Sequence, residues 1–108
     1  MRKEDYYLIK LEETEYLMKY MWRTGYSENT IKSYTNYFNR YMHESNKEFT
    51  IEAINNYMYT LMYTKECSHT FCNQVINALK LYAKITNHPD YNRFKYYPRP
   101  RGEKSFLK

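Results

Sequence analysis

Glycine and proline, the residues that make tight turns possible, are scarce in this chain. Its 108 residues include two glycines and three prolines. A many-stranded β fold needs frequent turn signals, so this scarcity favours helices joined by a few short links. The length suits one domain, and 15 tyrosines supply much of the apolar bulk. We therefore predict a compact all-α fold.

Four stretches have the spacing of amphipathic helices, with apolar residues three and four positions apart. Ser27 or Asn29, Thr50 and Ser68 stand where a helix N-cap is expected. Gly25 suits the end of the first helix. The predicted helices cover residues 6–22, a stretch from Ser27 or Asn29 to about residue 44, and residues of about 51–64 and 69–85. These segments predict a four-helix bundle.

The first predicted helix has its apolar residues near one face. These residues are Leu8, Leu11, Met18 and Met21, with Trp22 beside them. Glutamates and a lysine occupy the other side of the helix. We expect the apolar face to point into the core.

The net charge of +5 is concentrated in the last third of the chain. Residues 1–66 hold 9 basic and 10 acidic side chains, a net −1, whereas residues 67–108 hold 8 basic and 2 acidic, a net +6. Such a positive field attracts nucleic acid first and an anionic membrane second. Pro98 and Pro100 block a helix near the end. We expect a helical domain over residues 1–86 and a basic linker over residues 87–108.

The sequence has no sign of a membrane span or of export. No stretch approaches the roughly 20 apolar residues that cross a bilayer. The first residues lead into no continuous apolar run of the kind a signal peptide contains. We expect a cytoplasmic protein with no membrane partner, in which Cys67 and Cys72 are free thiols.

Catalytic and metal-binding patterns have little support. Cys67, His69 and Cys72 do not have a common zinc spacing, and a fourth ligand is missing unless His88 supplies it. Cys72 also falls on the apolar stripe of its helix, where cysteine packs as a small hydrophobe. Two glycines cannot build a phosphate-binding loop, and no Ser/His/Asp spacing is recognisable. We expect no active site, metal or cofactor here.

One face of the predicted helix over residues 69–85 is polar and carries no acid. Thr70, Asn73, Asn77, Lys80 and Lys84 follow one another at intervals of 3, 4, 3 and 4. Asparagine can bond adenine at two points in the major groove, and lysine can reach guanine or phosphate. The helix over residues 28–44 also carries exposed Asn, Thr and Lys. These side chains predict a duplex-binding surface, with simple solubilisation of the surface as the plainer interpretation.

Five stretches stand in a suggestive order along the chain. They are Tyr16-Leu17-Met18-Lys19-Tyr20; Gly25-Tyr26-Ser27-Glu28-Asn29-Thr30-Ile31-Lys32-Ser33-Tyr34; Phe49-Thr50-Ile51-Glu52-Ala53-Ile54; Ser68-x-Thr70-x-x-Asn73-x-x-Ile76-Asn77-Ala78-Leu79-Lys80-x-Tyr82; and Arg99-Pro100-Arg101-x-Glu103-Lys104-x-x-Leu107. In this order they resemble the N-terminal core-binding domain of the tyrosine recombinase (phage integrase) family, a SAM-like helical domain. The resemblance covers nearly the whole chain.

The resemblance implies a domain that clamps DNA together with a catalytic domain, its second and fourth helices facing the duplex. The DNA-binding residues that it implies are Asn29, Thr30, Lys32, Ser33 and Asn36 from the second helix, Thr70, Asn73, Asn77 and Lys80 from the fourth, and Arg99, Arg101 and Lys104 in the linker.

Catalysis in that family belongs to a C-terminal domain, and no His-x-x-Arg pattern occurs here. We therefore expect a non-catalytic fragment of a recombinase that acts in DNA integration and recombination. Its expected partners are double-stranded DNA, the catalytic domain of the same polypeptide and other recombinase protomers.

Two other functions stay open from the sequence. A helix-turn-helix regulator would need two helices joined by a tight turn and is usually dimeric. A helical protein-interaction module with a basic tail would use exposed aromatic residues as a contact patch. The candidates for that patch are Tyr6, Tyr7, Tyr59 and Tyr63.

Overall fold

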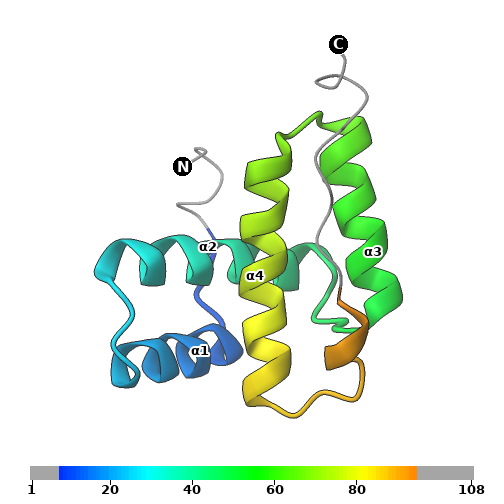
Figure 1. Cartoon of the computed structure of the whole chain (residues 1–108). Coiled ribbons are helices and arrows are strands. Elements are labelled where there is room, and N and C mark those ends of the chain that lie inside the picture. Colours follow the sequence, from blue (N-terminus) through cyan, green and yellow to red (C-terminus); the bar gives the residue numbers. More distant parts are fainter. Residues whose placement is uncertain (1–7, 95–108) are drawn as a thin grey trace.

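The computed structural model describes residues 8–94, where every regular element is a helix and there is no strand. Four α-helices form this part of the chain (Figure 1), which confirms the all-α prediction. The elements in order are α1 (Glu12–Arg23), α2 (Glu28–Glu44), α3 (Ile51–Tyr59), the π-helical turn η2 (Thr60–Thr64), α4 (His69–Ile85) and the 3-10 turn η3 (Tyr91–Arg93). Over these residues no helix combines the length and the apolar character that crossing a bilayer requires.

Helix α1 begins at Glu12, so the prediction that it begins at residue 6 was wrong for residues 8–11. Glutamates crowd the first turn of α1, where the positive end of the helix dipole favours them. The backbone N–H of Leu11 donates to the Asn39 side chain at 3.0 Å, which holds the preceding chain outside the helix. The glutamates were a local sequence signal for this start.

Helices α2 and α4 begin and end where the sequence predicts. The Ser27 hydroxyl accepts a hydrogen bond from the Thr30 N–H at 3.2 Å, and the Ser68 hydroxyl accepts one from the Phe71 N–H at 3.0 Å. Each serine thereby satisfies one of the N–H groups that a first helical turn leaves without a partner.

Helix α3 is shorter than predicted, because its last turn widens into η2. The Thr50 hydroxyl caps its start by accepting from the Ala53 N–H at 3.1 Å. At the other end, the Lys65 N–H donates to the Thr60 carbonyl at 2.9 Å, a bond that spans five residues. The predicted end at residue 64 holds for the helical segment as a whole, but its last five residues are π-helical.

The helices form two hairpins that cross (Figure 1). Helix α1 packs against α2, and α4 crosses α2 and packs on it. Helix α3 continues into η2, which packs against α4. Helix α2 is therefore covered by α1 on one flank and by α4 on another.

Aromatic side chains from three parts of the chain meet at the centre of the core. The rings of Phe38 and Tyr82 lie 4.4 Å apart between centroids, and Phe49 packs edge-on against Tyr82 at 5.2 Å. Tyr41 is fully buried, and its hydroxyl donates to the Glu48 carbonyl at 2.6 Å. Burial raises the pKa of Tyr41 to about 12. The core therefore joins α2, α4 and the link between α2 and α3.

The buried face of α1 agrees with the predicted one in part. Thr14, Leu17 and Met21 are buried, at the helical intervals of three and four residues. Met18 is half-buried, and Trp22 is 55 % exposed. Met18 packs against the core as predicted, whereas Trp22 was wrongly placed beside it and Leu17 was missed.

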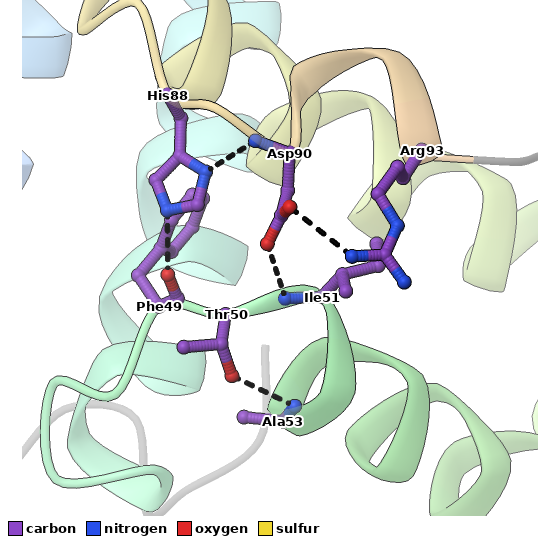
Figure 2. Close-up of polar contacts among 7 residues, drawn as sticks. All are labelled: Phe49, Thr50, Ile51, Ala53, His88, Asp90 and Arg93. Carbon is purple, nitrogen blue, oxygen red and sulfur yellow. Dashed lines mark hydrogen bonds and ion pairs between the residues drawn. The ribbon is translucent and has the colours of Figure 1, made fainter.

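Residues 88–94 fold back onto the start of α3 (Figure 2). His88 Nε2 donates to the Phe49 carbonyl at 2.8 Å, and its Nδ1 accepts from the Asp90 N–H at 3.0 Å. The Asp90 carboxylate accepts from the Ile51 N–H at 3.4 Å and pairs with Arg93 at 3.3 Å. We call His88 and Asp90 with these contacts the clasp. It anchors η3 beside α4, in a segment that the sequence assigned to the linker.

Candidate nucleic-acid interface

The outward face of α4 is polar and contains no acidic residue. Thr70, Asn73, Asn77 and Lys80 follow at intervals of three and four, so they share one side of the helix. The buried residues of α4, which include Cys72, Ile76 and Leu79, fall on the opposite side. The four residues predicted on this helix are therefore brought together, and all remain exposed or half-buried.

Two hollows lie along this face and share Asn77. The first, of about 230 Å³, is lined by His69, Thr70, Asn73, Gln74 and Asn77. The second, of about 310 Å³, is lined by Tyr26, Tyr34, Asn77, Lys80, Leu81, Lys84 and Tyr91. Because the two hollows share Asn77, we refer to them together as the α4 trough.

The second hollow has contributions from three further segments of the chain. Tyr26 follows Gly25, whose φ of +87° is a left-handed conformation that glycine adopts without strain. The Tyr26 N–H donates to the Met21 carbonyl at 3.1 Å and closes the turn after α1. Tyr34 comes from α2 and Tyr91 from η3. The hollow exists only where these segments meet α4.

Lys80 is positioned by the clasp through Tyr91. Its Nζ lies 5.6 Å from the centroid of the Tyr91 ring, within the range of a cation–π contact. Tyr91 sits on η3, which His88 and Asp90 tie to Phe49 and Ile51 (Figure 2). The direction of one predicted lysine thus depends on contacts with the start of α3.

The residues predicted on α2 do not join the α4 trough. Of these five (Asn29, Thr30, Lys32, Ser33 and Asn36), none lines either hollow. Lys32 pairs with Glu28 at 3.6 Å on an exposed surface, so this face of α2 is not free of acid. The Thr30 hydroxyl accepts from the Ser27 hydroxyl at 2.9 Å as part of the helix cap.

Tyrosines, and not the predicted polar residues, connect α2 with the outward side of α4. The Tyr37 hydroxyl donates to Gln74 Oε1 at 3.1 Å, and the Tyr37 ring packs edge-on against Phe71 at 5.2 Å. Tyr34 lines the second hollow. Sequence reasoning missed these residues because tyrosine at helical spacing was assigned to the core. It also left Gln74 out, and Lys84, though named in the polar stripe, was not among the implied DNA contacts.

Three predicted residues, Arg99, Arg101 and Lys104, lie outside the described residues. The basic side chains that the structure describes near the trough are Lys80 and Lys84.

The cysteines take the places expected of packed thiols. Cys72 is fully buried, and Cys67 is half-buried. Burial raises the pKa of the Cys72 thiol, and the neighbouring Cys67 adds to the rise, so Cys72 stays protonated and unreactive. Within residues 8–94, no three His, Cys, Asp or Glu side chains gather in a way that could hold a metal ion.

Comparison with protein-family models, with curated proteins and with solved structures finds no match to this chain.

Proposed function

We propose that this chain is a DNA-binding module that holds duplex DNA along the outward face of α4. The observation that carries the proposal is the α4 trough. Thr70, Asn73, Asn77 and Lys80 share it, Lys84 extends it, and α4 contains no acid. Nucleic-acid surfaces need this combination, because lysines attract phosphates and a nearby carboxylate would repel them.

The side chains of the trough match the chemistry of a DNA groove. Asparagine offers a donor and an acceptor together, which suits the edge of adenine, and threonine can bond a base or a phosphate. Lys80 and Lys84 stand one helical turn apart and can follow a phosphate backbone. Asn73 and Asn77 are the candidates for base contacts, and Lys80 and Lys84 for phosphate contacts.

Within this proposal the chain acts as the SAM-like core-binding domain of a site-specific tyrosine recombinase. The order of its sequence stretches and its four helices support that reading. Its partners would be duplex DNA, a catalytic domain on the same polypeptide and other protomers on the DNA. Residues 99–104, with Arg99, Arg101 and Lys104, would add phosphate contacts.

The proposal is tested by fluorescence anisotropy with a labelled duplex at low salt. Lys80→Ala should weaken binding to any sequence and lower the slope of log K against log salt by about 0.9. Asn77→Ala should weaken binding to a preferred sequence by roughly five- to a hundredfold. Lys19→Ala, which removes the same charge from the exposed face of α1, is the matched control and should leave binding unchanged.

Two results would contradict the proposal. One is the lack of any duplex binding at roughly 50 mM salt, where phosphate contacts are strong. The other is equal weakening by Lys80→Ala and Lys19→Ala, which would assign the affinity to net charge and not to the α4 trough.

A protein-interaction module is the second candidate, because one observation favours it. Tyr59 and Tyr63 are 61 % and 65 % exposed, and their rings lie 4.7 Å apart on α3 and η2. Such a pair is typical of a protein contact. Loss of partner binding on Tyr59→Ala, in a chain that does not bind DNA, would favour this candidate.

A further inference from the structure

We infer that the second hollow of the α4 trough binds one unpaired nucleotide, and that the chain therefore takes single-stranded as well as double-stranded DNA. This inference rests on the proposed function for the class of ligand and deepens it by naming the form of nucleic acid. It is carried by the lining of the hollow, which combines tyrosine rings with two lysines and no acidic residue.

The two sides follow from the order of residues around α4. At about 100° per residue, Lys80, Lys84, Asn77 and Leu81 occupy successive positions across about 100° of the helix surface. Lys80 is at the edge next to η3, because it lies over the Tyr91 ring. Leu81 is at the edge next to α2, because Gln74 and Phe71, two to three turns earlier on that side of α4, contact Tyr37 of α2.

The cationic side is suited to a phosphate. Lys80 and Lys84 place two ammonium groups one turn apart on the same hollow, and none of its seven lining residues is acidic. Tyr91 holds the Lys80 ammonium at 5.6 Å from its ring centroid, so less side-chain freedom is lost when Lys80 binds. The clasp keeps Tyr91 in that position (Figure 2).

The aromatic side is suited to a base. Tyr26 and Tyr34 line it, and both residues are half-buried, so each packs against the core and also faces the hollow. Every base has a π face, so stacking on tyrosine tolerates any sequence. Asn77 lies between the two sides, where its amide can bond the edge of the stacked base.

The size of the hollow favours one nucleotide over a segment of duplex. Its volume of about 310 Å³ is at the lower end of the roughly 300–1,000 Å³ found for small-molecule sites. A paired base in a duplex keeps its faces stacked on neighbouring bases and cannot present them to Tyr26 or Tyr34. A single strand, a frayed end or a flipped nucleotide can do so.

The test compares a labelled oligothymidylate of about 12 nucleotides with a duplex of the same length, at the same low salt. Tyr26→Leu and Tyr34→Leu keep apolar bulk but remove the π face, and each should weaken single-strand binding by roughly five- to a hundredfold. The ratio of single-strand to duplex affinity should therefore fall, because a paired base cannot stack on either ring. Tyr26→Phe and Tyr34→Phe keep the ring and should bind the single strand as the unmodified chain does.

A photocrosslink identifies the residues that the base contacts. It uses the unmodified chain, so it does not depend on whether the variants fold. Oligothymidylate with one 5-iodouracil, irradiated in the complex, should crosslink to the peptides that contain Tyr26 or Tyr34. A crosslink confined to Tyr59 or Tyr63, on the exposed pair of α3 and η2, would overturn the inference.

The outcomes separate this inference from the proposed function. Duplex binding without single-strand binding overturns the inference alone. Single-strand binding that both leucine variants retain in full also overturns it, because the rings would then play no part. Absence of binding to either probe overturns the inference and the proposed function together.

Discussion

The polar side chain of Asn39 holds α1 and the residues before it in place. It lies on α2 and is 8 % exposed. Its Oδ1 accepts from the Leu11 N–H at 3.0 Å and from the Thr14 hydroxyl at 2.6 Å, and its Nδ2 donates to the Ile9 carbonyl at 3.1 Å. One amide therefore ties the chain before α1, and α1 itself, to α2. A buried polar group of this kind stabilises only while every partner is satisfied.

We expect Asn39→Ala to lower the free energy of unfolding by about 2–4 kcal/mol, because the Leu11 N–H and the Thr14 hydroxyl would lose their acceptor. Urea denaturation followed by circular dichroism measures the change. Asn55→Ala, at an exposed position of α3, is the control and should stay within about 0.5 kcal/mol. An equal effect of both substitutions would contradict the role of Asn39.

Tyr41 should make the fold sensitive to high pH. Its pKa is raised from 10.0 to about 12 by burial, so the folded state holds the phenol proton more tightly than the unfolded state. The contribution of Tyr41 to stability is complete below pH 10 and is lost as the pH rises toward 12. Tyr41→Phe should therefore show a smaller fall in unfolding free energy across this interval. A fall as steep as that of the unmodified chain would assign it to other tyrosines, such as Tyr82, whose pKa burial also raises.

At the scale of the element, the two faces of α4 have different roles. Its buried face, with Val75, Ile76 and Leu79, contributes to the core, and its outward face forms the α4 trough. The Ser68 cap determines where the helix begins.

Two substitutions of Ser68 distinguish the contribution of the helix cap to stability from the effect of charge near the α4 trough on duplex binding. Ser68→Ala should cost about 1 kcal/mol of stability, because the Phe71 N–H loses its acceptor. Ser68→Asp should keep the stability, since aspartate is an equally good cap, but should weaken duplex binding by placing a negative charge at the end of the trough. Urea denaturation and anisotropy measure the two effects. If Ser68→Asp bound DNA as well as the unmodified chain, the end of α4 at Ser68 would lie outside the interface.

At the scale of the whole molecule, the last described residues complete the core. Phe94 is 6 % exposed, and its ring lies 6.2 Å from that of Phe49. Together with the clasp, this contact fastens the chain after α4 to the link between α2 and α3. The position of residue 94 is therefore determined by contacts with segments far away in the sequence.

Phe94→Ala should lower the free energy of unfolding by about 3–5 kcal/mol, the usual cost of emptying a buried aromatic site. Tyr63→Ala, which removes a ring that is 65 % exposed, is the control and should have a small effect. A loss for Phe94→Ala below about 1 kcal/mol, measured by urea denaturation, would mean that the segment after α4 adds little to the fold.

Much of the fold was predictable because its signals are local. Ser27, Thr50 and Ser68 each cap the helix that the sequence places after them. The start of α1 was predicted too early, because the signal of the glutamates in its first turn was overlooked and because the start also depends on Asn39, 28 residues further along the chain than Leu11. For the candidate site, the polar outward face of α4 was predicted from periodicity. The tyrosines beside it were not, because spacing cannot distinguish a ring in the core from a ring on the rim of a hollow.

By itself the sequence determined that the part of the chain from residue 8 to residue 94 is helical, where three of the four α-helices in it begin, and which face of α4 carries no acid. These properties depend on caps and on periodicity, both of which act over a few residues. The tertiary structure alone decided that Tyr26, Tyr34 and Tyr91 meet Lys80, and that the polar residues of α2 lie away from them. Crossing of α2 by α4 and closure of the clasp bring together residues as far apart as 26 and 91, and no local pattern encodes such contacts.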